Sequence, residues 1–444
     1  MLALLVTDSH RWPLAARAGL AFATGMTVLA VVLLAASLAG LPVRPWVGLL
    51  TLLVIVGAAV YFRRERVTRW CALQSNVAQP SAPTGPRWLD WILAAAIFVS
   101  LVTVATTALL EPLVEWDVLA IWAYKAKIFA RESIATTTYL TDISKGYSHL
   151  DYPVLWPFAM SWVWSFTGIT ELAAIKLLSV ALLLALISSF YGLLAMSVDR
   201  TTALLFTALL ASIPMVQNLT IRMGADVPLS LFLMISVAAI ADWFEHGLAS
   251  RLKLAGLAGT GLLLTKNEGM AIFAIIVATT VATLVLTRRV QSWRPVVGWL
   301  LALPALLSAP WFLLRTTIPK VHENMAAQMY PSIAIQNLDR LPQIAALTPR
   351  YLGSYEDWLW VWVLIPLVLV LGWRSYARPA IAFLAVVPQL ILLLYGYVYL
   401  VTPWDPATLI EVSLSRLAAH VAPLEIFLVA MIVGISGWLP WQNS

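Results

Sequence analysis

The chain has 444 residues, of which 61% are hydrophobic and only 11% are charged. This composition excludes a soluble globular domain and indicates an integral membrane protein with many spanning helices. The formal net charge of +6 does not indicate nucleic-acid binding, because the basic residues lie in short segments between apolar runs. The single cysteine, Cys71, excludes an intrachain disulfide and a cysteine-based metal cluster.

About twelve apolar runs follow one another along the chain, each long enough, or nearly so, to cross roughly 30 Å of hydrocarbon as a helix. They lie near residues 18–39, 46–62, 90–110, 172–196, 201–218, 227–243, 253–265, 269–287, 295–314, 358–373, 379–400 and 421–438. The sequence "TKNEG" separates the seventh run from the eighth, because a lysine and a glutamate inside one spanning helix would be costly. We therefore expect an all-α polytopic membrane protein.

The runs fall into an N-terminal hairpin at 1–70 and a larger membrane module at 90–444, joined by a Pro/Ser-rich linker at 71–89. Basic segments such as "RRERVTR" and "WRSYAR" all fall on one side of the twelve-span count. The positive-inside rule makes that side cytoplasmic, together with the linker and both termini. The acidic segment after residue 110 then faces the extracytoplasmic side.

Two surface helices are expected in this first extracytoplasmic segment. Four residues of the first helix share one stripe at helical spacing: Asp117, Ile121, Tyr124 and Ile128. We expect this helix to lie along the membrane surface, with Asp117 at its N-terminal end and Trp122 and Phe129 gripping the interface. The second, at 152–168, is apolar and Trp-rich but short, and a crossing there would move every later basic segment outside. It therefore indicates an interfacial or re-entrant helix.

Ionisable residues from five separate segments share the predicted outer side. The segments are "EWD" (115–117), "HLDYP" (149–153), "RMGAD" (222–226), "KNE" (266–268) and "SLSRLAAH" (413–420). Asp226 opens a span, and Arg416 is expected in a short loop before the last one. This gathering favours an extracytoplasmic active site over a channel, which would place its ionisable groups within the spans. Glu425 is the main charge within a span, and one such residue is typical of a packed, paired structural group.

The order of these features resembles the polytopic glycosyltransferases of the C superfamily (GT-C). Within it, the resemblance is to the branch of the protein O-mannosyltransferases and the lipid A aminoarabinose transferase. The motifs that carry it are "EWD", "DYPVLWP" (151–157), "GADVP" (224–228), "TKNEG" (265–269) and "SLSRL" (413–417). None is specific alone; their order and shared side make the resemblance, which covers roughly residues 90–438. The chain departs from the family in its two N-terminal spans and in lacking a large soluble domain after the last span.

The resemblance implies transfer of a sugar from a polyprenyl-phosphate carrier, such as undecaprenyl phosphate, to a lipid, glycan or protein acceptor. The reaction would take place on the extracytoplasmic face of a bacterial-type inner membrane. An acceptor hydroxyl needs a base, for which we expect Asp117, supported by Glu115. The leaving phosphate needs cations, for which we expect Arg416 and Lys266. Displacement by one base would invert the anomeric carbon.

Further residues are expected to hold the acceptor or to orient the base: Tyr124, His149, Asp151, Tyr152, Asp226 and Glu268. The spans near 253–287 and the outer loop at 315–357 are expected to wall a groove for the carrier lipid. No cofactor is required, although the carboxylates of "EWD" also suit Mg²⁺ or Mn²⁺.

Two other functions stay open at this point. An O-antigen ligase or polymerase would use a polyprenyl-diphosphate donor and a large outer loop, which 315–357 allows, but it does not explain the acidic pair in "EWD". A lipid flippase or small-molecule transporter would need a polar path through the bilayer, and the spans offer few charges for one.

Overall fold

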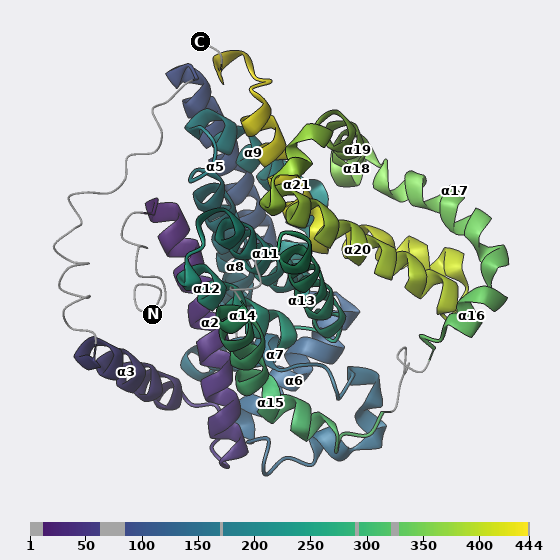
Figure 1. Ribbon diagram of the computed structural model, residues 1–444. Helices are drawn as coiled ribbons and strands as arrows, with labels where there is room; N and C mark the ends of the chain where they lie inside the picture. Colours follow the sequence, from purple (N-terminus) through teal and green to yellow (C-terminus); the bar gives the residue numbers. More distant parts are fainter. Residues whose placement is uncertain (1–11, 63–84, 169–171, 289–292, 321–327, 443–444) are drawn as a thin grey trace.

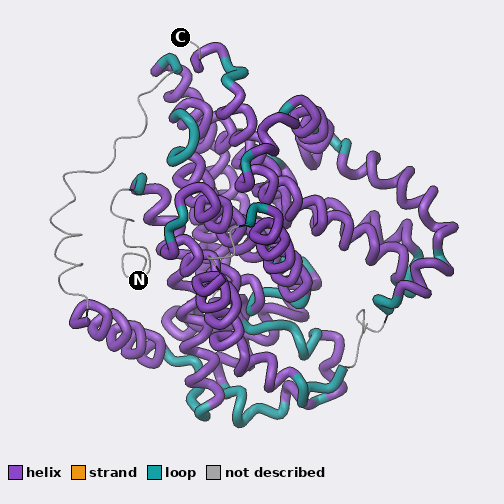
Figure 2. Tube along the Cα trace, in the orientation of Figure 1, coloured by secondary structure: helices purple, strands orange, loops and turns teal. Residues whose placement is uncertain are grey.

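The computed structural model describes residues 12–62, 85–168, 172–288, 293–320 and 328–442. The predicted linker at 71–89 lies mostly outside these residues. Helices are the only regular elements of the described part of the chain, which confirms the all-α prediction (Figure 2).

Eight described helices are long and apolar enough to cross a membrane, which supports the prediction of a membrane protein. They are α2 (Leu14–Leu38), α5 (Arg87–Leu110), α8 (Leu172–Leu194), α11 (Asp226–His246), α13 (Glu268–Leu286), the helical run Trp293–Arg315 that begins with α14 (Trp293–Pro295) and ends in α15 (Leu303–Arg315), α20 (Pro379–Val401) and α21 (Pro406–Ser436). By this measure of helix length and apolar composition, the described residues give fewer spans than the predicted number of about twelve. Two of the other predicted spans are short: α12 (Ala249–Leu263) has 15 residues and α19 (Val361–Leu371) has 11.

The predicted span at 201–218 is a broken helix. It consists of α9 (Arg200–Ser212) and α10 (Pro214–Arg222), which meet at an angle of 56° and would make a ninth span if counted as one. Proline at the first position of α10 cannot donate the backbone hydrogen bond that would continue α9, which explains the break. The bend aims the end of α10, with Arg222, towards the candidate site described below.

Helix α11 forms the centre of the bundle (Figure 1). Its apolar window is 94% buried, and it packs against α8, α12, α20 and α21. Since a helix that is apolar on every side is suited to a position surrounded by other helices, the sequence of α11 matches its place in the fold.

The first helix of the predicted N-terminal hairpin belongs to the core. Helix α2 packs along α8 and also contacts α12 and α7. Small residues allow this close approach: a Cβ atom at Gly192 would collide with the backbone of Ala16, and one at Gly19 would collide with Ser189. The structure therefore does not separate α2 from the module at 90–444. Helix α3 (Pro45–Phe62) extends away from the bundle instead (Figure 1).

Two helices that follow α5 and precede α8 in the chain cover the lower end of the bundle in Figure 1. A π-helical turn at Val118–Ala123 leads into α6 (Tyr124–Arg131), which packs against α7 (Leu155–Thr167). Trp122 and Phe129 are buried, and Phe129 contacts Phe158 of α7 with ring centroids 5.1 Å apart. The prediction that these two aromatic residues grip the membrane interface is wrong, because Trp122 packs against Tyr152 and Phe129 against α7 inside the protein.

Helix α7 has 13 residues, too few to cross a bilayer at 1.5 Å per residue, and much of it is buried. The described residues of the region 315–357 include three short helices: α16 (Pro331–Gln336), α17 (Leu341–Leu352) and α18 (Tyr355–Trp358). Helix α17 packs against α21, and Arg340 just before it donates to the Thr402 carbonyl over 2.8 Å. These contacts tie the region to the end of α20.

Candidate active site

A cavity of about 210 Å³ lies where five parts of the chain meet: the segment and π-helical turn before α6, the loop before α7, the α10–α11 junction, the turn between α12 and α13, and the middle of α21. Eight of the ten predicted site residues line it: Glu115, Asp117, His149, Tyr152, Asp226, Lys266, Glu268 and Arg416. Val118, Ile121, Trp122, Leu219, Arg222 and Gly224 complete the lining.

The "EWD" motif lies in the short connection between α5 and the π-helical turn. Glu115 and Asp117 line the cavity from the start of this helical turn, while Val114 and Trp116 are exposed. Asp117 makes no side-chain capping bond to the turn that follows it. Its Oδ2 instead accepts a hydrogen bond from Arg416 Nη1 at 2.7 Å. The motif thus contributes carboxylates to the cavity rather than a helix cap.

Arg416 lies inside α21, and the prediction of a loop at this position is wrong. The helix begins at Pro406, and Asp405 caps it by accepting from the Thr408 amide at 2.9 Å. The apolar run at 421–438 is only the second half of this 31-residue helix, whose first half is more polar. A helical backbone fixes the direction of Arg416 more firmly than a loop would.

Lys266 joins two carboxylates on the opposite side of the cavity. Its Nζ lies 2.9 Å from Asp226 Oδ1 and 3.1 Å from Glu268 Oε1. Burial alone would lower the pKa of Lys266, but the two carboxylates outweigh burial and raise it above its ordinary value. The break predicted at "TKNEG" makes this contact possible, since α12 ends at Leu263 and α13 begins at Glu268.

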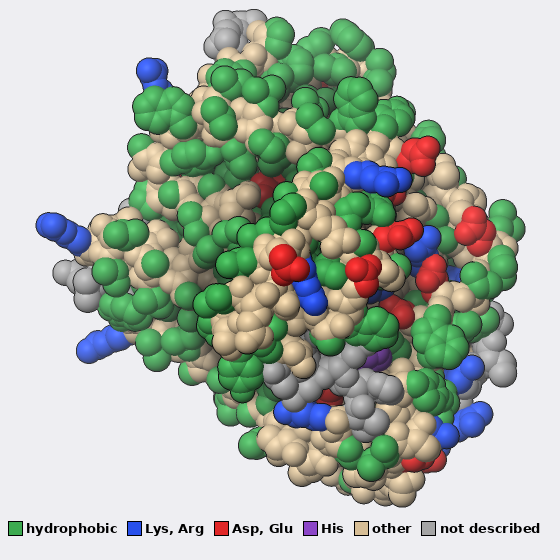
Figure 3. Space-filling view, turned by 90° about the vertical axis from the view of Figure 1, so that its right-hand side faces the viewer, with side chains coloured by type: hydrophobic (Ala, Val, Ile, Leu, Met, Phe, Trp, Pro, Cys, Tyr) green, Lys and Arg blue, Asp and Glu red, His purple; other side chains and the backbone are tan. Residues whose placement is uncertain are grey.

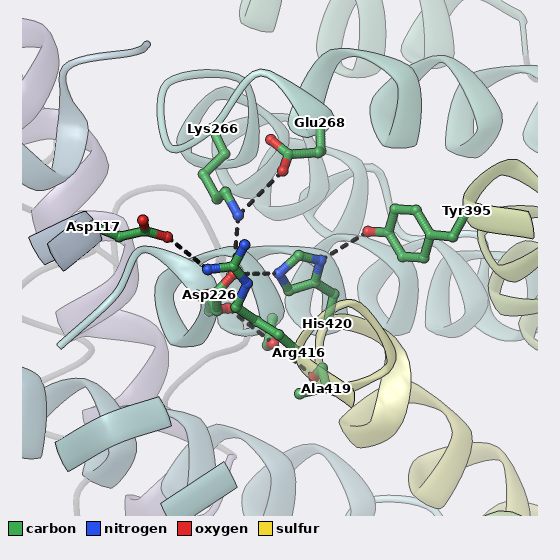
Figure 4. A network of polar contacts seen from close by, with 9 residues as sticks. Asp117, Asp226, Lys266, Glu268, Tyr395, Arg416, Ala419 and His420 are labelled. Carbon is green, nitrogen blue, oxygen red and sulfur yellow. Dashed lines mark hydrogen bonds and ion pairs between the residues drawn. The ribbon is translucent and has the colours of Figure 1, made fainter. Parts of the chain in front are cut away.

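His420 and Tyr395 extend this network behind the cavity wall (Figure 4). His420 Nε2 lies 2.8 Å from Asp226 Oδ1, and its Nδ1 lies 2.8 Å from Tyr395 Oη. Sequence reasoning assigned neither residue a role. One signal was present: His420 follows Arg416 by four positions, which places both on one side of a helix.

Arg222 forms a more exposed ion pair with Glu115. Its Nε lies 3.2 Å from Glu115 Oε1, and the Arg222 side chain is 59% exposed. Pairs exposed to this degree add about 0–1 kcal/mol to stability, so this pair is easily exchanged for another anion or cation. Arg222 is a cavity residue without a predicted role.

Lys125 supports the loop that brings His149 and Tyr152 to the cavity. It is fully buried on α6, and its Nζ donates to the carbonyl oxygens of residues 149, 150 and 152 at 3.0, 3.3 and 2.9 Å. Burial lowers the pKa of Lys125 to about 7, against an opposing effect of Asp151. The His149 ring stacks on the Tyr152 ring with centroids 4.5 Å apart, and Tyr152 in turn contacts Trp122.

The cavity lining does not include two predicted site residues. Asp151 accepts hydrogen bonds from Arg315 at 2.8 Å and from Asn267 at 3.0 Å. Burial would raise the pKa of Asp151, but these donors outweigh burial and lower it. Tyr124 contacts the rings of Tyr139 and Tyr147. Both residues shape the loops beside the cavity.

Charged side chains of both signs gather on the face shown in Figure 3, next to broad hydrophobic surface. Among the described residues, no group of three or more His, Cys, Asp or Glu is arranged to hold a metal ion. Arg222, Lys266 and Arg416 line the cavity beside its carboxylates.

Fold and cavity together define an all-helical membrane protein with a charged pocket at one end of its central helix. Comparison with protein-family models, curated proteins and solved structures finds no match for this chain. The function is accordingly argued from the geometry of the cavity.

Proposed function

We propose that the protein is a GT-C-like membrane glycosyltransferase that moves a monosaccharide from a polyprenyl-phosphate carrier to a lipid, glycan or protein acceptor. One observation carries the proposal. Asp117 and Arg416, separated by 299 positions in the chain, form an ion pair in one cavity that also holds Asp226, Lys266 and Glu268. A carboxylate base beside cations for a phosphate is the minimum that inverting sugar transfer requires.

The two aspartates differ in a way that separates their roles. Asp226 is buried, and its Oδ1 already accepts from both Lys266 and His420. The Asp117 side chain is 45% exposed, and its Oδ1 has no hydrogen-bond partner among the described residues. Two carboxylates in unlike environments commonly serve as an anchor and as a proton acceptor. We assign Asp117 as the base and Asp226 as a substrate-binding residue.

The reaction then proceeds in one displacement. The acceptor oxygen bonds to the anomeric carbon, the bond from that carbon to the phosphate oxygen breaks, and the acceptor proton passes to Asp117. Polyprenyl phosphate leaves with the electron pair of the broken bond. Arg416 and Lys266 stabilise the charge on its oxygens, since guanidinium and ammonium groups bind phosphate well. This scheme needs no metal ion.

The distribution of charge supports a cavity on the extracytoplasmic side. Helix α11 starts at the cavity and runs for 21 residues, about 30 Å. Near its far end Asp242 pairs with Arg251 at the start of α12, and Lys253 follows two positions later in the sequence. By the positive-inside rule this end is cytoplasmic. The assignment counts α3, the α9–α10 pair, α12 and α19 as crossings in addition to the eight long helices.

A thiol-labelling experiment tests the sidedness. Ser144→Cys, at an exposed position of the short 3-10 helix Ile143–Ser148 before α7, should react with a membrane-impermeant thiol reagent in intact cells. Cys71 should react only after the cells are opened. The opposite pattern would reverse the orientation.

Radiolabelled polyprenyl-phosphate sugars test the activity. Membranes that contain the protein should move label into a second lipid, glycan or protein fraction, and membranes without it should not. Mass spectrometry of envelope glycolipids from the two kinds of cells would identify the acceptor. Transfer from a polyprenyl-diphosphate donor alone would favour the ligase or polymerase alternative. Movement of intact carrier lipid without transfer would favour a flippase.

A further inference from the structure

Two partners hold one oxygen of the Asp226 carboxylate. Lys266 donates to Oδ1 from the α12–α13 turn at 2.9 Å, and His420 lies 2.8 Å from the same oxygen on α21. The other oxygen, Oδ2, lies towards Gly224, where a Cβ atom would come within 2.8 Å of it. Gly224 lines the cavity, and Oδ2 has no hydrogen-bond partner in the described part of the chain. One oxygen of Asp226 is thus fixed, and the other is left for a ligand.

The hydrogen-bond partners of His420 determine its tautomer. A phenol donates far more readily than it loses its proton, so the Tyr395 hydroxyl donates to Nδ1 over 2.8 Å. The ring proton of a neutral imidazole then resides on Nε2, from which it is donated to Asp226 Oδ1. His420 can therefore hold the carboxylate without itself becoming charged.

Neither His420 nor Tyr395 lines the cavity, and both are buried. Any effect of the two residues on a ligand must therefore pass through Asp226. A separate contact fixes the relative position of their helices: Ser230 on α11 donates to the Ala419 carbonyl on α21 over 2.9 Å. Asp226, Ser230 and His420 consequently hold the start of α11 against the middle of α21.

We infer that His420 and Tyr395 are positioning residues, which orient Asp226 so that its Oδ2 binds a hydroxyl group of the sugar or acceptor. The role of Asp226 in this inference rests on the proposed sugar transfer, whereas the orientation of its carboxylate does not. Without the Nε2 proton the carboxylate loses one of its two donors, and rotation about its χ2 angle would remove Oδ2 from the cavity wall. Arg416 lies one turn earlier on α21, so the same helix positions the phosphate-binding residue and the support of Asp226.

Three substitutions separate positioning from proton transfer. His420→Gln keeps a donor near the position of Nε2 and an acceptor for Tyr395, but it has no proton that titrates. His420→Leu removes both hydrogen bonds, and Tyr395→Phe removes only the hydroxyl that fixes the tautomer. Tyr399→Phe is the matched control, because Tyr399 is a buried tyrosine on the same helix whose hydroxyl contacts Ser413 at 3.0 Å.

Two measurements are made on each purified full-length variant. The first is transfer from radiolabelled polyprenyl-phosphate sugars to acceptors extracted from membranes of the source cells, followed across pH 6–9. The second is labelling of Asp226 by a hydrophobic carbodiimide, which reacts with protonated carboxyl groups and requires no substrate. Peptide mass spectrometry quantifies the labelling.

We expect His420→Leu to lose more than tenfold in transfer rate and to gain carbodiimide labelling at Asp226. His420→Gln should keep at least a third of the rate with an unchanged pH profile, and Tyr395→Phe should lie between the two. The Tyr399→Phe control should match the wild type. If His420→Gln is as inactive as His420→Leu, or if the Leu variant keeps its activity and low labelling, the positioning role is refuted. If no protein transfers sugar but the labelling follows the expected order, the positioning role stands and the proposed function fails.

Discussion

The substitution Asp117→Asn should separate catalysis from stability. The side chains of Arg416 and Asp117 are 37% and 45% exposed, and pairs this accessible contribute about 0.2–1 kcal/mol. The asparagine carbonyl can still accept from Arg416, so we expect the free energy of unfolding to fall by less than about 1 kcal/mol, or a melting shift of about 2 °C or less. Loss of the base should slow transfer by about 10²–10⁴-fold, equivalent to about 3–5 kcal/mol in the barrier.

The two quantities can be measured on one preparation. Thermal unfolding in detergent gives the stability, and transfer from radiolabelled polyprenyl-phosphate sugars gives the rate. Asp142→Asn is the matched control, because Asp142 is a solvent-accessible carboxylate of the same segment that bonds only to Ser144. Retention of a third or more of the activity by Asp117→Asn would remove Asp117 as the base. A large drop in melting temperature would show that the ion pair is structural.

Three further outcomes follow from the cavity and its supports. Asp226→Asn should lower the free energy of unfolding by about 3 kcal/mol. This is the low end for breaking a buried ion pair, because Lys266 keeps Glu268 as a partner. Thermal unfolding measures the loss, and a value below about 1 kcal/mol would contradict the argument from burial. Arg416→Ala should weaken binding of undecaprenyl phosphate at least tenfold, whereas Arg350→Ala on the exposed side of α17 should not, and equal effects in a lipid-binding assay would exclude the phosphate role. The folded-state pKa of Lys125 lies near 7, below the value of about 10.4 expected when unfolded, so the unfolded chain binds one more proton between these pH values. The free energy of unfolding of the wild type should therefore rise with pH in this range by up to about 1.4 kcal/mol per pH unit. Lys125→Met should lack this rise in melting curves at pH 7 and 9.

The sequence predicted which residues meet at the candidate site better than it predicted where the helices begin and end. Charged residues beside apolar runs are costly to bury alone, so "EWD", Asp226 and "TKNEG" could be expected to face one polar space. Hydropathy could not place Arg416 correctly. It starts the last span at the apolar run 421–438, whereas the helix already begins at Pro406 and includes Arg416. The local signal for its true start was present in Asp405 followed by Pro406, a residue pair that favours helix initiation.

Other features depend on tertiary packing and were not visible in the sequence. The same periodicity fits a helix whose aromatic residues face lipid and one whose aromatic residues face another helix, and only the position of α7 decides that Trp122 and Phe129 are buried. His420 and Tyr395 each look like isolated polar residues in apolar helices until α20 and α21 bring them together. Eight described helices meet the length criterion, fewer than the predicted number of about twelve spans, because several apolar helices are short or bent.

The close fit of α2 against α8 limits how the chain can be shortened. A truncation that removed residues 12–44 would leave Ser189 and Gly192 facing an empty groove along a helix that also supports α5 and α11. Lipid tails cannot fill a groove shaped for a helix backbone, so such a truncation should misfold. A separately expressed segment containing α2 could restore the protein by complementation.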